Sequence, residues 1–150
     1  MALLDKLNQL YNEREAIYDK IAKKSQLSQT SFMCLYFIRM EKEEKTQAEI
    51  ADDFFYPRQT INSAIQKLVH DGLVVLTIQK MKGHHKFVHL TEKGENFCKK
   101  WIDPMIKADN ESYLSLSTSD QEAFLRLYQS QLEVFKKSIK ESSILEDKYE

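Results

Sequence analysis

Glycine and proline are so scarce in this 150-residue chain that their positions constrain the fold more than any other feature. The chain has three glycines and two prolines, and Gly72, Gly83 and Gly94 all fall within one window of 23 residues. Glycine supplies tight turns, helix caps and close backbone approaches. The sequence therefore predicts one folded-back region in the middle of the chain, flanked on both sides by long helices.

The N-terminal flank carries an amphipathic pattern. Apolar side chains recur there at spacings of three and four, which is typical of one face of a helix. The members of this stripe are Leu3, Leu7, Leu10, Ile17 and Ile21. Ser28 is a candidate N-cap of a second helix, which we expect to bury Phe32, Leu35 and Tyr36.

The middle of the chain predicts two short helices joined by a tight turn. Thr46-Gln-Ala-Glu49 is a capping box, which starts a helix. Pro57 blocks its continuation, because the residue before a proline is pushed out of the helical region. A second helix over 58–71 has the apolar face Ile61, Ala64, Ile65, Leu68 and Val69, and Gly72 ends it. This arrangement is a helix-turn-helix.

Two strands follow the helix-turn-helix. Leu73 to Gln79 and Lys86 to Thr91 are rich in strand-forming residues. The basic segment 79–86 between them predicts a hairpin with Gly83 at its tip. The fold class is therefore mainly α with a small β-wing, a winged helix-turn-helix between N-terminal and C-terminal helices.

Further helices are expected after the wing. Thr91 is the candidate cap of the first of them, and we expect Pro104 to kink or break it. Ser117 or Ser119 caps the last helix, which carries apolar residues at helical spacing.

The charge distribution points to nucleic acid. Residues 57–90 contain five bases and one acid, Asp71, so this segment carries +4 although the chain carries −1. Clustered positive charge on an otherwise acidic chain is the electrostatic signature of a nucleic-acid site. The face of helix 58–71 opposite its apolar stripe is polar and has no acid before Asp71, and such a face can read base edges in the major groove. The candidate DNA-binding residues are Arg58, Gln59, Thr60, Asn62, Ser63, Gln66 and Lys67 on the helix, with Lys80, Lys82, His84, His85 and Lys86 on the wing.

Several short motifs lie in register along most of the chain: Leu27-Ser28, Thr46-x-x-Glu-Ile-Ala-x-x-Phe54, the run from Pro57 to Leu68, Asp71-Gly-Leu73, Leu90-Thr-Glu-Lys-Gly94 and Leu116-Ser117. Together they resemble the MarR family of bacterial transcription regulators. One stretch departs from the family pattern. Where the family wing commonly carries an arginine for the minor groove, this chain has Lys82-Gly83-His84, so Lys82 and Lys86 are expected to take more of the phosphate contact.

The resemblance implies one MarR-like domain over 1–150. Within it, 28–100 would form the winged helix-turn-helix, and 1–27 with 105–145 a helical dimerisation region. The resemblance implies a two-fold dimer that binds a pseudo-palindromic operator. It also implies, as for many members of the family, a repressor that a small-molecule effector releases from DNA. Double-stranded DNA, a second copy and such an effector are therefore the partners considered. The candidate dimer contacts are Leu3, Leu7, Leu10, Phe124, Leu127, Leu132 and Phe135, and the aromatics that could line an effector crevice or simply form core are Tyr11, Tyr18, Phe32, Tyr36 and Trp101.

Other classes of function find less support in the residues. His85 and His89 would lie about 13 Å apart along a strand, too far to share a metal ion. Cys34 and Cys98 sit in apolar patterns that favour core over redox sensing. No phosphate-binding loop or catalytic triad is visible, so we expect neither an enzyme nor a cofactor. No apolar run suits a membrane, and a cytoplasmic location is the default. The alternative function is a winged-helix protein-interaction module that does not bind DNA.

Overall fold

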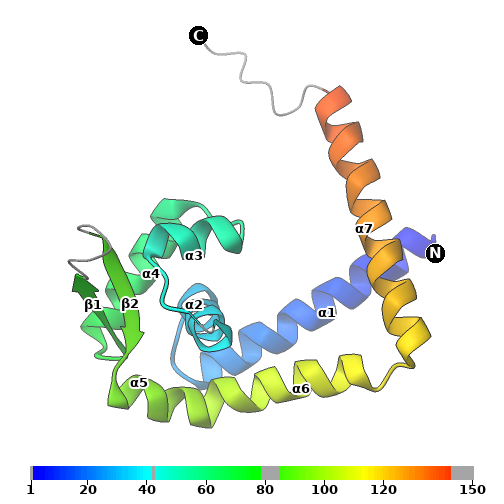
Figure 1. Cartoon of the computed structure of the whole chain (residues 1–150). Helices are drawn as coiled ribbons and strands as arrows, with labels where there is room; N and C mark the ends of the chain where they lie inside the picture. The colour runs from blue at the N-terminus through cyan, green and yellow to red at the C-terminus, as the bar shows by residue number, and fades with distance from the viewer. Residues whose placement is uncertain (1, 42, 79–84, 143–150) are drawn as a thin grey trace. The chain divides into compact units, whose positions relative to one another are not determined.

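The computed structural model describes residues 2–41, 43–78 and 85–142, and its elements follow the predicted order (Figure 1). They divide into two compact units, Met1–Lys107 and Ala108–Glu150. The elements are α1 (Leu3–Lys24), α2 (Gln29–Met40), α3 (Gln47–Asp53), α4 (Arg58–His70), β1 (Val74–Ile78), β2 (Lys86–Leu90), α5 (Glu92–Phe97), a π-helical turn (Cys98–Ile102), α6 (Asp103–Leu114) and α7 (Thr118–Glu141). The fold class is confirmed: a mainly helical chain with a two-stranded antiparallel wing.

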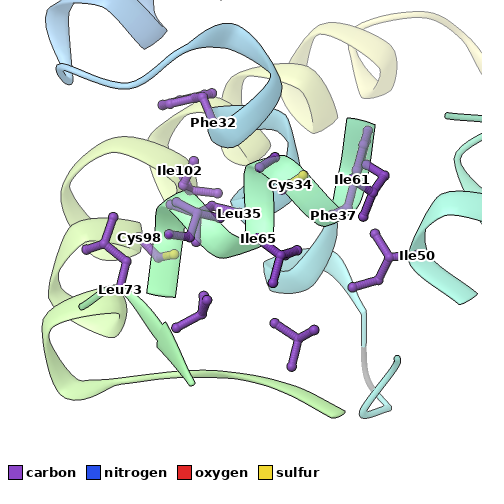
Figure 2. Close-up of a cluster of buried hydrophobic side chains, with 14 of the residues drawn as sticks. Phe32, Cys34, Leu35, Phe37, Ile50, Ile61, Ile65, Leu73, Cys98 and Ile102 are labelled. Atoms are coloured by element: carbon purple, nitrogen blue, oxygen red, sulfur yellow. The ribbon is translucent and has the colours of Figure 1, made fainter. Parts of the chain in front are cut away.

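The core of the first unit forms around α2, which packs against α1, α3, α4, β2 and the π-helical turn. Figure 2 labels buried side chains of this cluster from α2, α3, α4 and the π-helical turn. The fully buried large side chains include Phe32, Leu35, Ile50, Ile61, Ile65, Leu68, Val74 and Ile102. Because α2 has neighbours on several sides, its buried surface is wider than one stripe: Cys34 is buried as predicted, and Phe37 is buried as well, beyond what the sequence predicted.

The predicted helix caps are confirmed. Ser28 and Ser117 each accept a hydrogen bond from the amide three residues on, as does Thr91. β1 begins one residue later than predicted, because the amide of Leu73 donates to the carbonyl of Leu68 at the end of α4. β2 ends one residue earlier than predicted, because Thr91 is the N-cap of α5. The wing tip with Gly83 lies outside the described residues.

Two expectations need correction. The helix does not end at Pro104, because a π-helical turn precedes it and the amide of Asp103 donates to the carbonyl of Cys98, five residues back. A wide turn of this kind makes room where a proline ring would clash with an α-helical carbonyl. Tyr36, which we expected to be buried, is only partly buried and packs against the buried cluster. The carbonyl of Lys45 accepts a hydrogen bond from the amide of Val88 at 3.0 Å, which joins the segment before α3 to β2.

The helix α7 in the second unit stands out for its exposed apolar side chains. None of its 24 residues is buried. Val134 is 64% exposed, and Leu127 and Phe135 are more than half exposed. The N-terminal part of α1 is similar, since Leu3 and Leu10 are also mostly exposed. Across the described residues, no helix combines the length and apolar character that a membrane crossing requires.

Candidate nucleic-acid interface

The two helices of the helix-turn-helix are fixed by short-range contacts. Thr46 starts α3, because its hydroxyl accepts from the amide of Glu49 at 3.2 Å while Glu49 accepts from the amide of Thr46 at 2.8 Å. In the turn, the amide of Tyr56 donates to the carbonyl of Ala51 at 3.0 Å. Pro57 then directly precedes α4, where its missing N–H costs nothing. The start of α4 is thereby held rigidly against α3.

The helix α4 has one buried face and one exposed face, as predicted. Ile61, Ala64, Ile65 and Leu68 are buried against α2, α3 and β1. Thr60 is partly buried at the border of the two faces. The exposed candidates are Arg58, Gln59, Asn62, Ser63, Gln66 and Lys67. The structure thus brings the seven predicted helix residues together on or beside one solvent-facing surface.

The charged residues of this surface are not bare cations. Lys67 donates to Asp71 at 3.0 Å, and His70 lies 3.2 Å from the same carboxylate. Hydrogen bonds from Lys67 and, to a smaller extent, from His70 hold the pKa of Asp71 below its usual value. Arg58 at the other end of α4 is paired with Asp52. The uncharged polar side chains of α4 therefore lie between two ion pairs, one at each end of the helix.

A hollow of about 420 Å³ adjoins this surface and adds residues that the sequence did not single out. It lies between the start of α2 and the exposed side of α4. Its lining has five hydroxyls, one amide and one ammonium, and no carboxylate: Ser28, Thr30, Ser31, Gln59, Thr60, Ser63, Ala64 and Lys67. Sequence reasoning gave Ser28 only a capping role, because nothing in its local pattern reveals that it lies near α4.

The described part of the wing is a short antiparallel ladder. Val74 pairs with Leu90 and Ile78 with Lys86. His85 and Lys86 are exposed, as a DNA contact requires. Lys80, Lys82 and His84 lie outside the described residues.

His89 is partly buried and has two polar neighbours. Its ring lies 2.6 Å from the hydroxyl of Thr77 on the paired strand and 3.3 Å from the carboxylate of Glu44. Among the described residues, no group of three or more potential metal ligands comes together.

Both cysteines are core residues. Cys34 and Cys98 are fully buried, and burial raises the pKa of each thiol to about 12. A thiol with such a pKa stays protonated and is a poor nucleophile. Most of the aromatics considered for an effector crevice also pack in the core: Phe32 is fully buried, and Tyr18, Tyr36 and Trp101 pack against the buried cluster.

Comparison with known proteins agrees with this geometry. The MarR family model matches residues 25–81. A MarR family regulator from Neisseria meningitidis is similar in structure, with a TM-score of 0.73 at 21% identity over 95% of this chain and 99% of that chain. The transcription regulator MarR from Oenococcus oeni has a TM-score of 0.71 at 18% identity, over 88% of this chain and 99% of that chain.

A structure of Staphylococcus aureus MepR in complex with DNA is also similar, with a TM-score of 0.69 at 14% identity over 90% of this chain and 98% of that chain. No curated protein sequence matches the chain. Residues 25–81 therefore match the MarR family model, and the chain has a winged helix-turn-helix fold similar to that of these MarR family regulators.

Proposed function

We propose that this protein is a sequence-specific regulator of transcription that binds double-stranded DNA. The observation that carries the proposal is the polar face of α4, on which Gln59, Asn62, Ser63 and Gln66 are exposed while the opposite face is buried. Amide side chains of this kind can pair bidentately with adenine in the major groove. Lys67 and the lysines of the wing would add attraction to phosphates that does not depend on sequence.

We further propose that the working form is a homodimer. The apolar side chains of α7 and of the start of α1 are exposed within their own units, and exposed apolar patches of this kind mark interaction surfaces. A second copy of the chain is the simplest cover, because it would pair the same surfaces by a two-fold axis. Two copies would also place two recognition helices in successive major grooves, about 34 Å apart. Residues 28–100 would then bind DNA, and 1–27 with 105–145 would join the subunits.

Selection of bound sequences from a random DNA pool tests DNA recognition directly. We expect a pseudo-palindromic site, and binding to random duplex that weakens steeply as salt rises. The variant Gln59→Ala with Asn62→Ala should lose affinity for the selected site far more than for random duplex. Asn96→Ala with Asn110→Ala, which removes two exposed amides elsewhere, is the control. No binding to duplex DNA even at low salt would instead support the protein-interaction module.

Sedimentation equilibrium tests the dimer. Phe135→Glu puts a charge on the apolar face of α7 and should give monomers. Arg126→Glu, on the polar face of the same helix, should leave the dimer intact. A dimer that persists unchanged in Phe135→Glu would exclude the apolar face of α7 as the interface.

Repression is the regulatory outcome we propose, because a dimer seated on a site that overlaps a promoter blocks polymerase. A reporter gene behind the selected site should be less active when the protein is present. Higher activity would make the protein an activator.

A further inference from the structure

A carboxylate and a guanidinium are paired at the corner between α3 and α4. Asp52 lies in the last turn of α3, and Arg58 is the first residue of α4. The Nε of Arg58 donates to Oδ1 of Asp52 at 3.1 Å, and Nη2 donates to Oδ2 at 2.6 Å. Two parallel hydrogen bonds fix the plane and direction of the guanidinium. Arg58 is thus oriented although its side chain is 70% exposed.

The pair occupies one edge of the guanidinium and leaves another open. A guanidinium has five N–H donors in a planar fork. Asp52 takes the edge formed by Nε and Nη2, and within the described residues no hydrogen bond from Nη1 is found. The open edge, formed by Nη1 and the second N–H of Nη2, has the spacing that pairs with O6 and N7 of guanine. Arg58 can therefore donate to a guanine without releasing Asp52.

The pair also changes what Arg58 offers to phosphates. A free arginine on a DNA-facing surface is attracted by any phosphate, whatever the sequence. A carboxylate beside it offsets that attraction, and Asp52 itself would repel the backbone. Asp52 therefore lowers the non-specific affinity for DNA, but it orients the donor edge of Arg58 toward a base.

We propose that Asp52 is a positioning residue for base recognition: it holds Arg58 so that the free guanidinium edge reads a guanine at one fixed position of each half-site. The inference rests on the proposed DNA-binding function and adds the identity of one base to it. Arg58 is the residue that touches the base, and Asp52 acts through Arg58.

The neighbouring acid provides a matched control. Asp53 is on the same helix, is also exposed, and is paired with Lys45 instead of Arg58. Asp52→Asn and Asp53→Asn therefore change the net charge equally, but only Asp52→Asn loosens Arg58. Because both side chains are exposed, we expect both variants to fold, which circular dichroism checks.

The experiment measures binding to the site selected for the unaltered protein, to copies of it in which each G·C pair is replaced in turn by A·T, and to random duplex. Replacing the guanine read by Arg58 should weaken binding of the unaltered protein by about 5- to 100-fold. Arg58→Ala should remove most of this preference. Asp52→Asn should reduce it by at least about 3-fold, while binding to random duplex is kept or strengthened and becomes more salt-dependent. Asp53→Asn should keep the preference.

A double variant separates orientation from charge. If Asp52 acts through Arg58, Asp52→Asn should not reduce the preference any further once Arg58→Ala is present. Equal effects of Asp52→Asn and Asp53→Asn, an unchanged preference in Asp52→Asn, or the absence of any guanine whose effect depends on Arg58 would each overturn the inference. If Gln59 and Asn62 matter for the selected site while Asp52 does not, the proposed function stands and this inference alone fails. If the unaltered protein binds no duplex, both fail.

Discussion

Replacing Gly94 by alanine tests how closely α5 packs on the wing. A methyl group at Gly94 would lie 2.0 Å from the carbonyl oxygen of Leu73 and 3.3 Å from Cδ2 of Leu90. Real Cβ contacts are essentially never shorter than 3.0 Å, so α5 and the start of β1 must separate by at least about 1 Å. The carbonyl of Leu73 also accepts from the amide of Thr91 at 3.0 Å. Any such movement therefore strains the cap of α5.

The expected change in the free energy of unfolding is the sum of opposing contributions. Overpacking of this kind costs about 1–3 kcal/mol, and weakening one hydrogen bond costs about 1 kcal/mol more. Alanine in place of glycine inside a helix returns about 1 kcal/mol. We therefore expect Gly94→Ala to lower the free energy of unfolding by about 1–3 kcal/mol.

Urea unfolding followed by far-UV circular dichroism measures this loss, at one fixed protein concentration because assembly changes apparent stability. Asn96→Ala is the control, since Asn96 is exposed on the same helix and should lose nothing. If Gly94→Ala matched or exceeded the parent in stability, the close approach of α5 to Leu73 would be refuted.

Three further predictions concern the same unit. Thr46→Ala removes the capping hydroxyl of α3 and should cost about 1 kcal/mol in urea unfolding, whereas no loss would mean that the capping box is not formed in solution. The hydrogen bond from Arg39 holds the pKa of Asp103 below its usual value, so this stabilisation is complete above the unfolded pKa of about 3.9 and is lost as pH falls through the lower folded value. Arg39→Met should flatten the stability–pH curve in that range, and an unchanged curve contradicts the pairing. Phe55→Gly should keep stability or raise it by up to about 1 kcal/mol, because Phe55 has a φ of 56° and is 94% exposed. A loss larger than 1 kcal/mol would show that Phe55 is not strained.

The parts of the fold that the sequence predicted well depend on residues close together in the chain. The capping box of Thr46 involves four consecutive residues, and the stop at Pro57 involves two. The polar face of α4 follows from spacing within one helix, so its exposure was predictable as well. Local rules sufficed for these features because their partners are fixed by backbone geometry.

The parts that the sequence missed depend on residues brought together from afar. Arg39 of α2 pairs with Asp103, 64 residues later, and with Glu95. The carbonyl of Lys45 accepts a hydrogen bond from the amide of Val88, a contact that no sequence periodicity predicts. The pair of Asp52 with Arg58 spans only six residues, but it crosses a turn whose angle the sequence does not state. Such contacts need the tertiary fold before they can be seen.

The π-helical turn at Cys98–Ile102 has a consequence for comparing this chain with its relatives. Each residue advances an α-helix by roughly 100°, so one extra residue in a wide turn shifts the phase of everything after it by about that angle. Residues 103–107 therefore point in different directions than they would in an unbroken α-helix that began at Glu92. An alignment without a gap in this helix will pair buried positions with exposed ones when the relative lacks the wide turn. A gap of one residue within 98–102 restores the pairing of equivalent positions.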